Sequence, residues 1–144
     1  MDTIDKKIIS ILQSNARAKI TWIGERVGLS SPAVTERIKR LEDKGVIEAY
    51  TALINYKKNG YQLKAMITLS AFMGRLKPFL SKVKKYEEVL NCYRVTGNEN
   101  IIMEVILKDQ AHLQLFIDEL ITYGEVKTHI ILSSVVQNQS AIDP

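Results

Sequence analysis

Residues 21–45, TWIGERVGLSSPAVTERIKRLEDKG, decide how the first part of this chain folds. They predict a short helix over residues 22–27, with Thr21 as its N-cap. Gly28 ends this helix, because glycine readily adopts the left-handed conformation that follows a helix C-terminus. A three-residue turn, Gly28-Leu29-Ser30, then leads to the next helix.

The second helix of this stretch is longer and begins at Ser30-Ser31-Pro32, where hydroxyl side chains precede a proline. It ends at Lys44-Gly45, since basic side chains and glycine both favour a helix C-terminus. Its apolar residues recur at i, i+4 and i+7 and share one face: Val34, Ile38 and Leu41.

Another helix precedes these two, over about residues 4–15, with Asp2 or Thr3 as its N-cap. Its apolar residues also share one face: Ile4, Ile8, Ile11 and Leu12. Three short helices with a tight turn between the last two form the helix-turn-helix layout. In that layout the second helix of the pair enters the major groove of DNA by its N-terminal end.

The helix over residues 30–44 supplies the candidate DNA contacts. The side chains assigned to phosphates lie at the helix start or carry a guanidinium: Ser30, Ser31, Arg37 and Arg40. The side chains predicted to face base edges project from the exposed side: Pro32, Thr35 and Lys39. The alternative interpretation is an ordinary amphipathic helix whose charged side chains are only solvated.

The distribution of charge favours the DNA-binding interpretation. Residues 1–60 contain eleven Lys/Arg and seven Asp/Glu, and residues 61–144 contain nine of each, which makes 20 and 16 for the whole chain. The net charge of +4 therefore belongs to the N-terminal part. A positive excess is expected on a surface that faces a polyanion.

Residues 46–56, VIEAYTALINY, are rich in β-prone side chains. They predict one or two strands that lead into a hinge. The polar turn that follows, residues 57–60, places a domain boundary near Gly60.

The rest of the chain alternates between strand and helix patterns. Strands are predicted over residues 64–72, 89–96, 101–107 and 126–136, and helices over residues 76–86 and 110–123. The βαββαβ order is that of a ferredoxin-like domain, a four-stranded antiparallel sheet with both helices on one face. We therefore predict an α+β chain with a helix-turn-helix domain over residues 1–60 and a ferredoxin-like domain over residues 61–144.

The second face of such a sheet is left uncovered. A small domain cannot leave a large contiguous apolar patch in water, so self-association through this face is expected. The sequence therefore predicts at least a homodimer.

Several other classes of protein are not supported. No apolar run approaches the roughly 18 residues of a membrane span, and the start MDTIDKK lacks the apolar core of a secretory signal, which predicts a cytoplasmic protein without a membrane partner. The single Cys92 cannot form an internal disulfide. His112 and His129 lack further ligands at metal-binding spacing, and no activated nucleophile or phosphate-binding glycine loop is present, so we expect no metal, no cofactor and no enzyme activity. RNA binding on the sheet is disfavoured because residues 101–105 offer no aromatic side chain for stacking.

Six segments together resemble a known family. Four lie in the first part of the chain: Asp5-x2-Ile8-Ile9-x2-Leu12, Val27-Gly28-Leu29-Ser30, Val34-x2-Arg37-Ile38-x2-Leu41-Glu42 and Gly45-Val46-Ile47. Two lie in the second part: Tyr93-Arg94-Val95-Thr96-Gly97 and residues 128–132. They are similar to the DNA-binding and effector domains of the leucine-responsive/asparagine-type (Lrp/AsnC, feast/famine) transcriptional regulators, over about residues 2–136.

This resemblance implies a dimer joined through its C-terminal sheets, often assembled further into an octameric disc that bends or wraps DNA. It also implies that a free amino acid binds between dimers, near the hairpin after Gly97. The candidate effector residues are those of the hairpin loop: Gly97, Asn98, Glu99 and Asn100.

The loop departs from the family pattern. Many members carry an acidic residue three positions after the glycine, and often another directly after it, where this chain has Asn100 and Asn98. A carboxylate binds an ammonium group more strongly than an amide does. Glu99 is one source of the missing charge, and the alternative is a plain hairpin loop, since Gly and Asn suit a turn with positive φ.

Two functions remain open from the sequence. The first is a sequence-specific transcriptional regulator that responds to a small effector such as an amino acid. The second is an architectural protein that bends or wraps DNA with little specificity and without an effector. They differ in whether base contacts by Thr35 and Lys39 matter.

Overall fold

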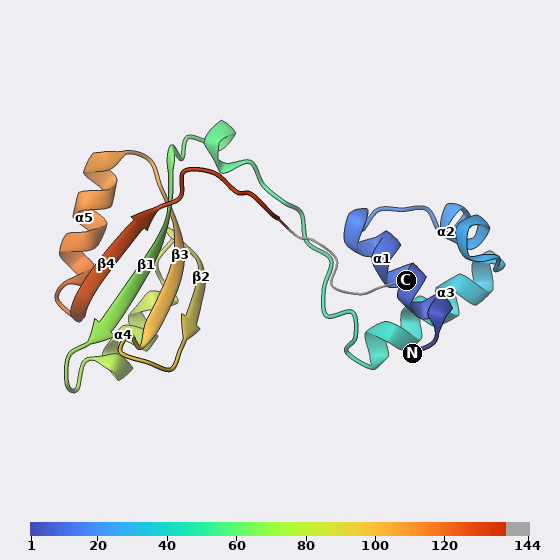
Figure 1. Ribbon diagram of the computed structural model, residues 1–144, viewed down its shortest axis with the longest axis horizontal. Helices are drawn as coiled ribbons and strands as arrows, with labels where there is room; N and C mark the ends of the chain where they lie inside the picture. The colour runs from blue at the N-terminus through green and yellow to red at the C-terminus, as the bar shows by residue number, and fades with distance from the viewer. Residues whose placement is uncertain (138–144) are drawn as a thin grey trace. The chain divides into compact units, whose positions relative to one another are not determined.

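The computed structural model describes residues 1–137 of the 144-residue chain. It divides the chain into two compact units (Figure 1). One comprises Met1–Leu53 together with the described residues from Val135, and the other comprises Ile54–Ser134. The second domain predicted from the sequence runs to residue 144, and its part from 138 onward lies outside the described residues.

The first unit contains three helices, α1 (Thr3–Ser14), α2 (Ile20–Val27) and α3 (Ser31–Asp43), as the sequence predicts. Their apolar faces meet in one buried cluster: Ile8, Ile9, Ile23, Val34, Ile38 and Leu41. Full burial of one such side chain contributes roughly 1.5 to 3 kcal/mol. This cluster therefore holds the three short helices together.

The helix starts differ in detail from the sequence prediction. Asp2 caps α1, and its side chain and the Asp5 side chain each accept the other residue's backbone N–H, which forms a capping box. Thr21 is not the cap of α2: the helix begins earlier, at Ile20, which packs against the buried cluster, and Lys19 takes the N-cap position. Ser30 does occupy the N-cap position of α3.

The strands predicted over residues 46–56 are wrong. Among the described residues no strand pairs with this segment, and a strand is stabilised by its hydrogen-bonded neighbour. The backbone N–H groups of Val46 and Ile47 instead donate to the carbonyl oxygen of Leu41 and close the end of α3. A short 3₁₀ helix, η1 (Tyr56–Asn59), follows and ends at Gly60.

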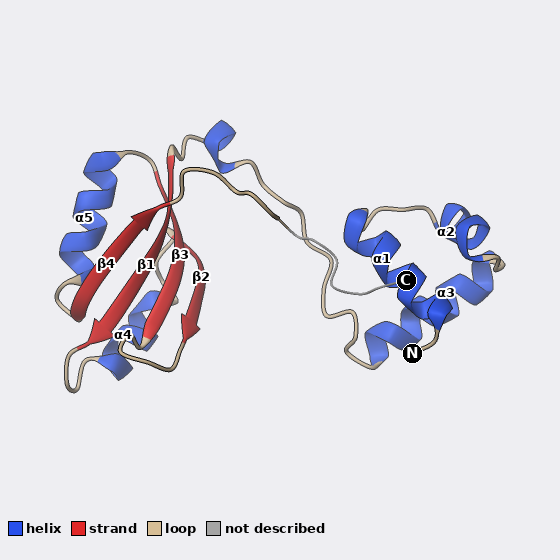
Figure 2. Cartoon of the chain, viewed as in Figure 1, coloured by secondary structure: helices blue, strands red, loops and turns tan. Residues whose placement is uncertain are grey.

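The second unit is a four-stranded antiparallel sheet with two α-helices, as predicted (Figure 2). Its elements are, in chain order, β1 (Leu63–Ala71), α4 (Leu76–Val83), β2 (Val89–Arg94), β3 (Ile101–Leu107), α5 (Gln110–Leu120) and β4 (Gly124–Ile130). The strand order is β2-β3-β1-β4. This is the ferredoxin-like arrangement.

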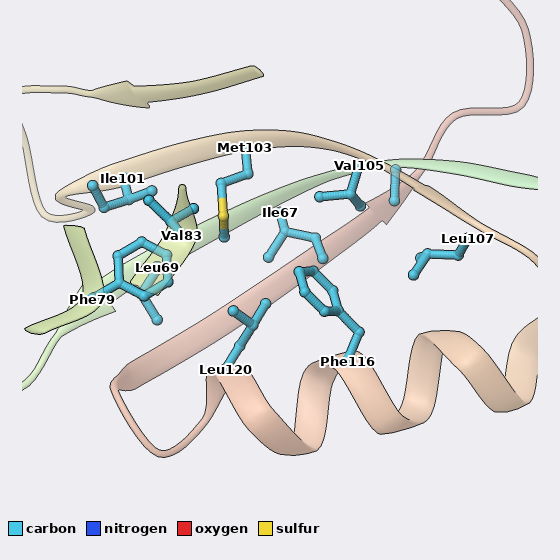
Figure 3. Packing of buried hydrophobic residues seen from close by; sticks show 11 residues of the cluster. Ile67, Leu69, Phe79, Val83, Ile101, Met103, Val105, Leu107, Phe116 and Leu120 are labelled. Carbon is cyan, nitrogen blue, oxygen red and sulfur yellow. The ribbon is translucent and has the colours of Figure 1, made fainter. Parts of the chain in front are cut away.

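The core of this unit lies between one face of the sheet and the two helices (Figure 3). Alternate strand residues point toward the helices and are buried: Ala65, Ile67, Leu69, Ile101, Met103 and Val105. Phe79 and Val83 from α4, and Phe116 and Leu120 from α5, pack against them. The strand residues that alternate with inward-facing ones lie on the opposite face, which we call the open face. They include Met66, Thr68, Ile102 and Glu104, together with Lys127 of β4, which is paired with Thr68.

The last strand is shorter than predicted. The sequence pattern extends it to Val136, but β4 ends at Ile130. Its partner β1 begins at Leu63, and the register pairs Ala65 with Ile130. Ile131 makes one further hydrogen bond, to the carbonyl oxygen of Lys64, and the described residues that follow it belong to no strand.

No helix among the described residues has the length and apolar character that crossing a membrane requires.

Candidate DNA-binding surface and effector loop

Two glycines set the geometry of the turn between α2 and α3. Gly28 has a φ of 71°, in the left-handed region that an L side chain disfavours. Gly24 is buried in α2, and a Cβ at this position would lie only 2.5 Å from the carbonyl oxygen of Leu29. The missing side chain therefore lets α2 lie directly against the turn.

The side chains predicted to face bases share one exposed face of α3. Pro32, Thr35 and Lys39 are all exposed. At about 100° of rotation per residue, they lie within about 60° of one another around the helix. The Thr35 hydroxyl donates to the carbonyl oxygen of Ser31 at 3.0 Å, so its lone pairs remain as acceptors.

The start of α3 suits an anion. Ser30 is exposed and its side chain makes no capping hydrogen bond, while Ser31 is half-buried. The N-terminus of a helix presents free N–H groups and a partial positive charge. A phosphate oxygen at this position would be stabilised by both.

The two arginines of α3 contact carboxylates of α1. Arg37 Nη1 lies 2.7 Å from Asp2 Oδ2 and 2.7 Å from Asp5 Oδ1. Arg40 Nη2 lies farther away, 3.3 Å from Asp5 Oδ2. The Arg37 side chain is 23% exposed and the Arg40 side chain 49%. Their assignment to phosphates stays a prediction, and the contacts distinguish the two residues.

Charge stabilisation in this cluster appears in its pKa values. Burial by itself would raise the pKa of Asp5, but hydrogen bonds from Arg37 and from the Asp2 backbone outweigh it and lower the pKa. The pKa of Asp2 is lowered by the hydrogen bond from the Asp5 backbone and by Arg37. The same bonds, to Asp2 and then to Asp5, raise the pKa of Arg37.

The hairpin loop between β2 and β3 lies against the end of β1. Gly97 has a φ of 113°, as expected for a glycine in a tight turn. The Ser70 hydroxyl donates to the carbonyl oxygen of Asn98 at 3.0 Å. The Asn100 side-chain oxygen accepts the backbone N–H of Ala71 at 2.6 Å. Asn100 therefore helps to fix the loop on the sheet.

Glu99 supplies the charge of this loop and is paired with a lysine from β4. Its carboxylate lies 3.0 Å from Lys127 Nζ. The hydrogen bond from Lys127 is the main reason why the pKa of Glu99 is lowered. The pair is partly open to solvent, with side-chain exposures of 32% for Glu99 and 66% for Lys127.

Sequence reasoning missed Asp2, Asp5 and Lys127 as members of these sites. Asp2 and Asp5 at the start of α1 indicate a helix cap, but the pattern does not reveal that α3 lies opposite. Lys127 is 28 residues from Glu99. Only the pairing of the strands brings them together. Within residues 1–137, no group of three or more His, Cys, Asp or Glu side chains could hold a metal ion.

Comparison with protein families gives two matches. Residues 1–48 match the family described as winged helix-turn-helix DNA-binding. Residues 64–141 match the family described as the Lrp/AsnC ligand binding domain. The two matches cover most of the chain.

Individual proteins similar to the chain agree with these matches. The HTH-type transcriptional regulator FL11 of Pyrococcus furiosus is 36% identical over 118 residues, which is 82% of this chain and 78% of FL11. The solved structure of LrpC from Bacillus subtilis has a TM-score of 0.89 and 27% identity, over 94% of this chain and 97% of that one. The complex of transcriptional regulator NMB0573 from Neisseria meningitidis with L-Met has a TM-score of 0.89 and 26% identity, over 100% of this chain and 96% of that one.

Proposed function

The chain belongs to the Lrp/AsnC family of transcriptional regulators, DNA-binding proteins with a ligand-binding domain, and on this premise we propose how it reads DNA. The α3 helices of a homodimer enter the major groove at two half-sites that are about one helical turn, or a multiple of it, apart. The observation that carries this proposal is the single exposed face of α3 formed by Pro32, Thr35 and Lys39.

Each DNA contact has a distinct role in this proposal. Thr35 and Lys39 contact base edges, where Lys39 donates and Thr35 accepts. Ser30 and Ser31 bind a phosphate at the start of α3, and the half-exposed Arg40 binds another. Phosphate contacts add affinity for every sequence, whereas the base contacts select the operator.

The open face of the sheet is the proposed dimer interface. Met66, Thr68 and Ile102 lie on this face, and they are half-buried although neither helix of the unit covers it. The Thr68 hydroxyl oxygen is buried and has no hydrogen-bond partner among the described residues. Covering this face with a second copy removes apolar surface from water at about 25 cal/mol per Å². Assembly of dimers into an octamer is proposed from the family resemblance.

A free amino acid is the proposed effector, bound at the loop over residues 97–100. Glu99 accepts the ammonium group of the effector in place of Lys127, and Gly97, Asn98 and Asn100 shape the loop around it. The L-Met complex of NMB0573, a structure similar to this chain, supports an amino acid as the ligand class. Because the side chains of Asn98 and Asn100 are uncharged, Glu99 is the carboxylate that the loop offers to the effector.

The cellular setting follows from the ligand. In bacterial or archaeal cells such as those of the relatives, chromosomal DNA lies in the cytoplasm, and we propose that location. The proteins similar to this chain are named as regulators, which supports a binding role rather than an enzymatic one.

The decisive test is binding of the purified protein to its own upstream DNA and to a scrambled sequence, across a salt series, with and without an amino-acid mixture. Tighter binding to the upstream DNA is expected, with a shift when amino acids are added. Equal binding to both DNAs, with a steep salt dependence, would instead identify an architectural protein that bends or wraps DNA. Absence of binding at low salt would refute DNA binding.

A further inference from the structure

The ion-pair cluster between α1 and α3 is more extensive than a helix cap needs. Asp2 Oδ1 accepts the backbone N–H of Asp5 at 2.8 Å, and this bond completes the cap. In addition, Asp2 Oδ2 and Asp5 Oδ1 both accept hydrogen bonds from Arg37 Nη1, each at 2.7 Å. Asp5 is 3% exposed, so this pair lies at the edge of the core.

Arg37 faces away from the proposed DNA-binding face. At about 100° per residue, Arg37 lies about 160° around α3 from Lys39 and from Thr35. It lies only about 60° from the buried Val34. A residue in this position is directed toward α1 when Thr35 and Lys39 are directed toward DNA.

Arg40 differs from Arg37 in each of these respects. It lies about 100° around α3 from Lys39, at the side of the proposed DNA-binding face. Its contacts with Asp5, at 3.3 and 3.4 Å, are longer, and its side chain is 49% exposed. Arg40 can therefore exchange the Asp5 carboxylate for a phosphate, whereas Arg37 is held by two short contacts.

We propose that Arg37 is a positioning residue, which with Asp2 and Asp5 fixes the rotation of α3 on α1 and thereby supports base discrimination without contacting DNA. Arg40 is the phosphate contact of the pair. This inference rests on the proposed function, and it removes Arg37 from the phosphate contacts predicted from the sequence. A base contact loses its selectivity when the helix that carries it rotates by a few degrees, because hydrogen bonds weaken steeply with misalignment.

The test compares Arg37→Gln with the matched control Arg40→Gln in the full chain. Binding to the upstream and the scrambled DNA is measured across a salt series, and folding is checked by thermal unfolding. For Arg40→Gln we expect both affinities to fall together and the salt slope to decrease by about one. For Arg37→Gln we expect an unchanged salt slope and an about tenfold smaller preference for the upstream DNA, which is a loss of about 1.4 kcal/mol of discrimination.

A salt slope that falls by about one in Arg37→Gln, with the preference intact, would show a phosphate contact and overturn the positioning role. An unchanged slope with an unchanged preference would overturn it as well. If Arg37→Gln does not fold, Asp2→Asn replaces it, because asparagine still caps a helix while the charge that holds Arg37 is reduced. In that variant a smaller preference for the upstream DNA supports the proposal, and an unchanged preference overturns it.

Failure of the proposed function has a different signature. If the wild-type protein binds both DNAs equally, the proposed sequence-specific binding is refuted. The positioning role of Arg37 in base discrimination is then refuted with it. A change confined to the salt slope of Arg37→Gln would refute only the positioning role.

Discussion

Asp5 shows how a single charged side chain can be kept in a small core. It is the charged residue that the described part of the chain buries, and a buried carboxylate is unfavourable unless it is paired. Here the Asp2 backbone N–H, Arg37 and Arg40 all reach it. Removal of one partner from such a pair is more harmful than the pair's net contribution, because it leaves an uncompensated charge.

Acid should weaken the first unit through this cluster. The pKa values of Asp2 and Asp5 in the folded protein lie below the ordinary value of 3.8 for an aspartate, so their stabilising contribution is present above that value. It is lost as the pH falls through the lowered values. We expect the urea midpoint to fall as the pH drops from about 5 to well below 3.8. Unfolding is monitored by the fluorescence of Trp22, the single tryptophan of the chain.

The matched variants are Asp5→Asn and the exposed Asp43→Asn. Asp5→Asn should be less stable at pH 7 and should lose less of its stability in acid, whereas Asp43→Asn should follow the wild type. Equal acid dependence in Asp5→Asn and the wild type would contradict the role given to the cluster.

Thr35 is expected to read a hydrogen-bond donor. Its hydroxyl proton is already given to the Ser31 carbonyl oxygen, so a base amino group, of adenine N6 or cytosine N4, is the partner that suits it. Thr35→Ala should relax the sequence preference at one position of a mapped site by roughly 1 kcal/mol, with an unchanged salt slope. Thr35→Ser, which retains the hydroxyl, should keep most of the preference. A mapped site whose preference survives Thr35→Ala would show that this face does not read bases.

Among the elements, the short helix α2 depends mainly on contacts with its neighbours, because only its C-terminal end, at Gly28, has a hydrogen-bonded cap. Its N-cap Lys19 makes no side-chain capping bond, and a helix of eight residues is too short to be stable alone. Ile23 is completely buried, and Gly24 brings the backbone of α2 against the turn. The angle between α2 and α3 thus depends on one missing Cβ.

Gly24→Ala should destabilise the first unit by about 1 to 3 kcal/mol, the usual cost of overpacking. The added Cβ would meet the Leu29 carbonyl oxygen at 2.5 Å, and backbone atoms cannot move aside as a flexible side chain can. Thermal unfolding monitored by Trp22 fluorescence measures the effect. The exposed neighbour Glu25 provides the control, since Glu25→Ala should change stability by no more than about 0.5 kcal/mol. A Gly24→Ala protein as stable as this control would show that the turn can relax.

For the whole molecule, the proposed function depends on assembly into a dimer. One copy carries one α3 helix, and a two-half-site operator needs two. The open face of the sheet mixes half-buried apolar residues with an ion pair between Lys64 and Glu104, which also accepts a hydrogen bond from Asn91. In the proposed dimer, such a face would provide both apolar area and polar groups that fix the register of the second copy.

Ile102→Lys should abolish the dimer, because it places a charge in the middle of the open face. Sedimentation should show a monomer, and binding to a two-half-site DNA should weaken toward that of a single half-site. Leu115→Lys is the control, since Leu115 is exposed on α5, on the other side of the sheet. A protein with Ile102→Lys that still sediments as the wild type does would place the interface elsewhere.

The sequence alone was enough to predict the order of the α-helices and of the four sheet strands, the apolar faces of α1 and α3, and the exposed face of Pro32, Thr35 and Lys39. These features follow from caps and periodicities that act over a few residues. Tertiary packing, by contrast, leaves residues 46–56 without a strand and ends β4 at Ile130, because a strand forms only where a partner strand runs beside it. It also decided the partners of Arg37 and Glu99, which lie 35, 32 and 28 residues away in the chain. Local patterns carry no information on such pairs, since packing of distant elements brings their charges together.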